Sequence, residues 1–225
     1  MFFSRGAQAE ARSKALVPGR RRAMQERLLA TLIGRSYRVA QRSGLPVYWL
    51  DETRQAGGGF GQRLADAYRQ VFDQGYEAVI AIGNDCPDLL PGDLVAAAQQ
   101  LARYPMVCGP AADGGAYLIG LRREAFDAAG LAALDWDDTQ SRTALDGYAT
   151  RWALAVAWLA EKTDLDHAGA LVRWLAQPQR AGALARLLRS LLQRATATPR
   201  PPDSFALPAD LPRRPWAGRA PPAQA

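Results

Sequence analysis

The apolar run Ala78–Ile82 (AVIAI) constrains the fold more than any other part of this sequence. It lacks the alternation of apolar and polar residues that a strand with one exposed face shows, and the segment GNDCPD follows it directly. Such a strand is typical of a parallel sheet that helices cover on both faces. We therefore expect a buried central strand whose carboxyl end lies next to Asp85.

The rest of the chain alternates between helical and strand patterns. Apolar residues at helical spacing predict helices over Arg22–Gln41, Phe60–Gln74, Pro91–Tyr104, Asp166–Ala176 and Gly182–Leu192. Short runs of strand-forming residues predict strands at Phe2–Phe3, Pro46–Leu50, Met106–Gly109, Ala116–Leu121 and Ala153–Leu159. We expect a polar loop from Phe3 to about Gly19. The alternation indicates one open α/β sheet.

At 225 residues, the chain has room for one domain with a tail. We place the domain at residues 1–178, a C-terminal helix at 179–195 and a tail at 196–225. The tail contains eight prolines and few large apolar residues, a composition that does not compensate for the entropy lost on folding. We therefore expect residues 196–225 to be disordered.

Composition narrows the classes of function. Lys and Arg exceed Asp and Glu by 28 to 22, but much of the excess lies at residues 20–22 and 180–219, so a nucleic-acid partner is not favoured. Two cysteines and one histidine give neither a disulfide framework nor zinc-ligand spacing. The longest apolar run of the C-terminal half, residues 152–160, is too short to span a membrane. We expect a cytoplasmic protein.

Asp85 is the first candidate for chemistry. Ligands of open α/β sheets bind beyond the carboxyl ends of the strands, and a carboxylate held there is suited to a divalent cation. Asp85 could equally cap a turn beside Pro87. The triplet Asp113-Gly114-Gly115 would let backbone approach a ligand, but taken alone it favours a hairpin turn. The glycines at 57–61 lack the spacing of the known phosphate-binding loops.

Several motifs, taken in order, resemble a known family. These are FSR…SKAL, GGGFGQRLADAY, GYEAVIAIGNDCPDL, GPAADGGAYLIGL, LDWDDT and TDLD, between about Phe2 and Leu175. They resemble the DUF2064 group of the GT-A superfamily, which includes arsenosugar-biosynthesis-associated glycosyltransferases and is related to molybdenum-cofactor guanylyltransferases. The resemblance implies a GT-A, Rossmann-like, three-layer α/β/α sandwich with a mostly parallel sheet.

The resemblance also implies roles for individual residues. Asp85 would bind Mg²⁺ or Mn²⁺ and take part in catalysis, with Asp166 as a second metal ligand, although Asp166 could instead cap the helix that follows it. Asp113 would be catalytic, and Gly114 and Gly115 would lie on the acceptor side. The implied nucleotide-binding residues are Arg5, Lys14, Gln55, Gly59, Gly61 and Arg63.

The function that the resemblance implies is transfer of a sugar from a nucleotide-sugar donor to a small-molecule acceptor, with a metal cofactor. Nucleotidyl transfer of the cofactor-guanylyltransferase type is an alternative, because both reactions need the same cation and phosphate cradle. A catalytically degenerate binding protein with the GT-A fold is another. This alternative arises because Ala9-Glu10 replaces the family's usual Pro-Gly and His167 replaces a threonine.

Overall fold

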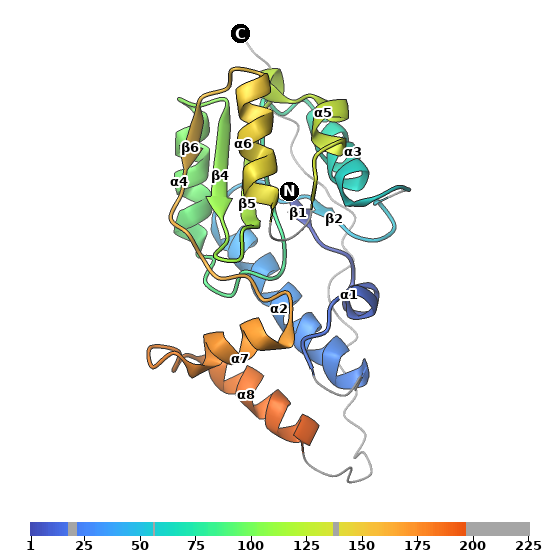
Figure 1. The fold of residues 1–225 in the computed structure, drawn as a ribbon, viewed down its shortest axis with the longest axis vertical. Helices are drawn as coiled ribbons and strands as arrows, with labels where there is room; N and C mark the ends of the chain where they lie inside the picture. Colours follow the sequence, from blue (N-terminus) through green and yellow to red (C-terminus); the bar gives the residue numbers. More distant parts are fainter. Residues whose placement is uncertain (18–21, 56, 137–139, 197–225) are drawn as a thin grey trace.

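The computed structural model describes residues 1–17, 22–55, 57–136 and 140–196, with side chains described as far as residue 193 (Figure 1). Its strands are β1 (Phe2–Phe3), β2 (Trp49–Leu50), β3 (Ala78–Ile82), β4 (Met106–Pro110), β5 (Ala116–Arg122) and β6 (Val156–Trp158). They form one sheet in the order β2-β1-β3-β5-β4-β6. All neighbouring strands are parallel except that β5 is antiparallel to both β3 and β4. The mostly parallel α/β sheet is therefore confirmed.

Eight α-helices lie in the described residues. They are α1 (Ala7–Ser13), α2 (Arg22–Arg42), α3 (Phe60–Phe72), α4 (Pro91–Leu101), α5 (Ala128–Ala132), α6 (Ser141–Arg151), α7 (Ala168–Ala176) and α8 (Ala183–Thr196), with a 3₁₀ turn at Arg123–Ala125. None of the helices in this part of the chain combines the length and apolar character needed to cross a membrane.

Three of these helices depart from the sequence predictions. The expected polar loop after Phe3 contains α1, whose sequence AQAEARS is rich in good helix formers but too short for a clear apolar period. The helices α5 and α6 were not predicted, because neither carries a strong apolar stripe. The end of α6 at Arg151 delays the next strand, so β6 covers only Val156–Trp158 of the predicted 153–159.

Helices cover both faces of the sheet. On one face, α3, α5 and α6 pack on inward-facing residues of β3, β4 and β5, with Tyr68 of α3 fully buried and its hydroxyl donating to the carbonyl of Ile119 at 2.6 Å. On the other face, α2 and α4 pack on Phe2, Ile82 and Leu118. Residues on both sides of the central strands are buried, which explains the apolar run at 78–82.

A third apolar cluster lies at one end of the molecule, where α7 and α8 pack beside α2 (Figure 1). Leu28, Leu171 and Leu188 are each fully buried there. The cluster ties α8, expected as a separate C-terminal segment, to the same core as α2 and α7. The tail predicted from residue 196 lies, from 197 onward, outside the described residues.

We predict that Leu188→Ala lowers the free energy of unfolding by about 2 to 4 kcal/mol, because it leaves a cavity in this cluster. The neighbouring Leu187 is 45 % exposed on the same helix, so Leu187→Ala should cost less than about 1 kcal/mol. Urea unfolding of both variants measures the difference. Equal, small losses would show that α8 does not contribute to the folded core.

Candidate active site

The ends of five strands bring the candidate residues to one edge of the sheet. The register pairs Phe2 with Ile82, and Ile82 with Leu118 near the start of the antiparallel β5. It also pairs Pro110 with Ala116, and Cys108 with Trp158. The segments after β1, β3, β4 and β6 therefore leave the sheet at the same edge, which is where ligands of open α/β sheets bind.

A cleft of about 390 Å³ opens at this edge. Eight polar or charged residues are buried in the described part of the chain, and six of them line this cleft: Ser4, Glu10, Gln55, Asn84, Ser141 and Asp164. Buried polar groups are costly unless they have partners, so their concentration in one cleft makes it the candidate binding site. Its volume is in the range that small-molecule sites occupy.

A lysine ammonium joins the two predicted metal ligands. Lys14 Nζ donates a hydrogen bond to Asp85 Oδ2 and another, of 2.9 Å, to Asp166 Oδ1. The three side chains are between 17 and 22 % exposed. Because one nitrogen contacts both oxygens, the two carboxylates are close enough to be ligands of one cation.

Backbone hydrogen bonds hold these three residues in place. The N–H of Leu165 donates to the carbonyl of Asp85 at 2.9 Å, and the N–H of Ala168 donates to the carbonyl of Ala15 at 3.0 Å. His167, not Asp166, caps α7, because its Nδ1 accepts from the N–H of Ala170. The alternative role of Asp166 as the cap of this helix is therefore wrong.

The electrostatics of this group are dominated by burial and by its carboxylates. Burial alone would lower the pKa of Lys14, but the charges of Asp85 and Asp166 more than offset it and hold that pKa above its usual value. Lys14 therefore carries a full positive charge at neutral pH.

Asp164 is a further acidic residue of the cleft, to which the resemblance assigned no role. It is 8 % exposed, and its Oδ1 has no hydrogen-bond partner. Burial, and then the charges of Asp85 and Asp166, raise the pKa of Asp164 well above its usual value. The floor of the cleft thus holds more acidic groups than Lys14 can neutralise.

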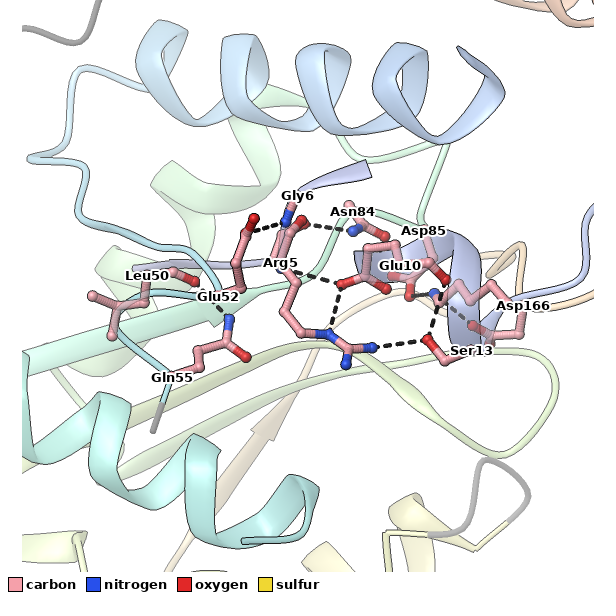
Figure 2. A network of polar contacts seen from close by, with 12 residues as sticks. Arg5, Gly6, Glu10, Ser13, Leu50, Glu52, Gln55, Asn84, Asp85 and Asp166 are labelled. Atoms are coloured by element: carbon pink, nitrogen blue, oxygen red, sulfur yellow. Dashed lines mark hydrogen bonds and ion pairs between the residues drawn. The ribbon is translucent and has the colours of Figure 1, made fainter. Parts of the chain in front are cut away.

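Arg5 belongs to the network that α1 builds beside this group (Figure 2). Its Nη2 donates to Ser13 Oγ at 2.8 Å, its Nε lies 3.6 Å from Glu10 Oε1, and its backbone N–H donates to the same Glu10 oxygen. Arg5 lines the cleft as predicted, but its guanidinium already has a carboxylate partner. A phosphate would have to share it with Glu10.

Gln55 and Arg63 also line the cleft. Gln55 is buried and donates through Nε2 to the carbonyl of Leu50 at 2.6 Å, which fixes the segment after β2. Arg63 donates through Nη1 to the carbonyl of Gly58, while its buried Nε has no partner. Burial lowers the pKa of Arg63. Its incomplete hydrogen bonding makes Arg63 the better placed of the two for an anion.

Gly59 and Gly61 are not among the residues that line the cleft. Gly59 is exposed and is the N-cap of α3. Gly61 is buried against α5: a Cβ atom there would lie 2.5 Å from the carbonyl oxygen of Ala132 and 2.6 Å from Trp136 Nε1. The glycine at 61 is required by the close approach of α3 to this segment.

Asp113, Gly114 and Gly115 form the turn between β4 and β5. The N–H of Ala111 donates to the carbonyl of Gly115, Asp113 Oδ1 accepts from the N–H of Gly115, and Gly114 has φ +98°. The prediction that this motif forms a hairpin turn is confirmed. Gly115 lines the cleft, whereas Asp113 is exposed at the turn and is not among the lining residues. Its negative charge nevertheless raises the pKa of Asp164.

Aromatic side chains form another part of the cleft lining. Phe60 is 44 % exposed, and its ring lies 5.7 Å from that of Phe3 and 5.3 Å from that of Trp136. These residues were not predicted as site residues, because apolar side chains next to strands and helices usually indicate core. An exposed phenyl ring beside an indole offers a flat apolar surface for a base or a sugar ring.

The donor set is compatible with a divalent cation. Within the described ranges, no three His, Cys, Asp or Glu side chains are arranged to hold a metal ion by themselves. Mg²⁺, however, is commonly bound by one or two carboxylates, with substrate phosphates and waters completing its coordination. Asp85 and Asp166 provide two carboxylates, and the unpartnered oxygen of Asp164 lies in the same cleft.

The sequence profile of the family described as "Uncharacterized protein conserved in bacteria (DUF2064)" matches residues 39–137. The resemblance to the DUF2064 group is confirmed. The matched segment contains Asp85, Asp113 and Arg63 but excludes Lys14 and Asp166, so it is narrower than the range inferred from the motifs. The N-terminal part, where Ala9-Glu10 replaces the usual Pro-Gly, lies outside it.

A solved structure from Desulfovibrio desulfuricans G20, described as a candidate nucleotide-diphospho-sugar transferase, has a similar fold. The two chains are 22 % identical, the TM-score is 0.69, and the match covers 86 % of this chain and 96 % of that one. No curated protein sequence matches this chain. At this identity the structural match shows a shared fold, which agrees with the α/β fold that the motifs implied.

We predict that Gly61→Ala lowers the free energy of unfolding by about 1 to 3 kcal/mol, since the added methyl group would overlap backbone and indole atoms. Gly147→Ala is the matched control: Gly147 lies within α6, and nothing is within 4 Å of a Cβ placed there. That substitution should raise stability by about 0.5 to 1 kcal/mol. Thermal melts compare the two, and a neutral Gly61→Ala would contradict the packing explanation.

We also predict that the effect of Asp164→Asn on thermal stability depends on pH in metal-free buffer. The pKa of Asp164 is raised in the folded protein above the value of about 3.9 expected in an unfolded chain. The folded state therefore binds more protons above that pH, and stability falls as the pH rises through the folded-state pKa. The variant lacks this loss, so its Tm relative to wild type should increase as the pH is raised above about 4. A constant difference would argue against a strained Asp164 carboxylate.

Proposed function

We propose that this protein is a metal-dependent glycosyltransferase that takes its sugar from a nucleotide-sugar donor. The observation that carries the proposal is the convergence of Asp85 and Asp166 on one cationic nitrogen in a cleft at the carboxyl edge of the sheet. The structural neighbour described as a candidate nucleotide-diphospho-sugar transferase supports the choice of donor.

Asp85 and Asp166 would hold the metal ion, Mg²⁺ or Mn²⁺. A bound divalent cation supplies positive charge that stabilises a diphosphate leaving group. Arg63, with its unpartnered Nε, and Arg5 would bind the donor's phosphates in the same cleft. Phe60 and Trp136 offer the apolar surface against which a base or sugar ring packs.

The acceptor would enter beside Gly115, the residue of the β4–β5 turn that lines the cleft. In the reaction, the acceptor oxygen forms a bond to the anomeric carbon as the bond from that carbon to the diphosphate breaks, and a base takes the acceptor's proton. Asp113, at the same turn, is the residue predicted to act as that base. Gly114 supports the turn through its positive φ.

The first experiment is a thermal-shift screen of nucleoside diphosphates and nucleotide sugars, each with Mn²⁺, with Mg²⁺ and with EDTA. A ligand that binds only the folded state must raise the Tm. Reaction products then separate sugar transfer from nucleotidyl transfer, because the first converts a nucleotide sugar into a nucleoside diphosphate, whereas the second, assayed with nucleoside triphosphates, releases pyrophosphate. Binding without turnover would identify a degenerate binding protein.

We predict that Asp85→Asn abolishes the metal-dependent part of the nucleotide-induced Tm shift. For the wild-type protein, with the nucleotide at about a hundred times its Kd, that shift should be about 5 to 10 °C. Asp146→Asn is the matched control, since Asp146 is exposed on α6 and does not line the cleft. An Asp85→Asn protein that keeps the full metal-dependent shift would remove Asp85 from the proposed metal site.

A further inference from the structure

The position of Lys14 has a consequence for how a metal could enter the cleft. Its ammonium contacts Asp85 Oδ2 and Asp166 Oδ1, which belong to the two carboxylates that the proposed function assigns to the cation. A divalent cation held between these carboxylates would lie within a few ångströms of the ammonium, and repulsion between the positive charges disfavours binding of both.

We propose that Lys14 is an internal cation that occupies the metal position in the metal-free protein, and that Mn²⁺ or Mg²⁺ binds by displacing its ammonium from Asp85 and Asp166. This inference rests on the metal site of the proposed function and adds a competitor from the chain itself. It assigns to Lys14 a part in controlling metal affinity, in place of the phosphate-binding role expected from the sequence.

The backbone around Lys14 is fixed, so the exchange involves only the side chain. The N–H of Lys14 donates to the carbonyl of Glu10 at 2.9 Å at the end of α1, and the adjoining Ala15 pairs with His167. A lysine side chain has a flexible four-carbon stem and compact charge, which lets the ammonium move while the main chain stays in place.

Charge balance explains why the metal-free site needs a cation. Asp85, Asp164 and Asp166 lie close enough for their charges to affect one another, and Asp113 adds to the potential at Asp164. Lys14 lies among them, while the nearby Arg5 is engaged by Glu10. Without the ammonium, carboxylates packed at this distance would repel one another in a poorly solvated cleft.

Asp164 shows that the Lys14 ammonium does not provide a hydrogen-bond partner for every carboxylate oxygen of the site. Its Oδ1 is buried and has no partner while Lys14 bonds to the other two carboxylates. The cleft therefore retains an acceptor oxygen for a cation of higher charge. A divalent ion would bring two positive charges to these acidic groups, where the ammonium brings one. The excess of carboxylates therefore favours the divalent ion over the ammonium.

The test compares Lys14→Met with wild type, using Mn²⁺ alone and no nucleotide. In EDTA, Lys14→Met should have a Tm lower by roughly 5 to 10 °C, because it leaves the carboxylates without their partner. Calorimetric titration should then show that Lys14→Met binds Mn²⁺ about tenfold more tightly than wild type, or better. In wild type the Lys14 ammonium fills most of the sites, and the apparent affinity for Mn²⁺ is reduced by the fraction of sites that are free. Mn²⁺ should restore the lost Tm.

Lys162→Met is the matched control. Lys162 is also a partly buried lysine paired with a carboxylate, at 3.1 Å from Asp93, but it does not line this cleft. Its removal should leave Mn²⁺ affinity unchanged. If Lys14→Met is too unstable to titrate, Lys14→Gln, which keeps a hydrogen-bond donor without the charge, should show the same gain in affinity.

The outcomes separate the two proposals. Equal Mn²⁺ affinity in wild type and in the Lys14 variants would overturn the exchange and leave the metal site intact. Weaker binding in the variants would also overturn it, because Lys14 would then support the metal. Absence of Mn²⁺ binding in all of the proteins would remove the metal site and the exchange together.

Discussion

Two backbone hydrogen bonds determine where the charged groups of the cleft lie. The bond from Leu165 to the Asp85 carbonyl and the bond from Ala168 to the Ala15 carbonyl join segments that are far apart in the sequence. Main-chain bonds of this kind do not depend on the side chains that they position. The fold can therefore hold Asp85, Asp166 and Lys14 together even though this arrangement concentrates negative charge.

The sequence predicted the parts of this arrangement that depend on strong local patterns. The strand at 78–82 and the place of Asp85 at its carboxyl end follow from a run that only a doubly covered strand can bury. The helix over 60–72 follows from a clear apolar stripe. The resemblance implied that Asp166 acts with Asp85, and β6, which runs parallel to β4, leads the chain to Asp166 at the same edge.

What the sequence could not predict is set by contacts between distant residues. The buried Glu10 looked like part of a polar loop, since a helix as short as α1 carries too few turns to reveal its buried side. The resemblance assigned Gly61 to nucleotide binding, whereas its neighbours Ala132 and Trp136 explain the lack of a side chain. The pairing of Lys14 with two aspartates likewise has no local signature, because its partners lie 71 and 152 residues away.

Some features of the cleft oppose folding and are therefore better explained by ligand binding than by stability. A core formed for stability alone would not leave Asp164 buried with an unpartnered oxygen beside two other carboxylates, because desolvation and repulsion both oppose folding. The three apolar clusters, which bury the helices on both faces of the sheet and at its end, provide the stability against which this cost is balanced. A ligand that brings positive charge to the cleft relieves part of the cost, so binding there is favoured by strain that folding has already accumulated. The carboxylates that would gain most from such a ligand are Asp85, Asp164 and Asp166, which lie around the Lys14 ammonium.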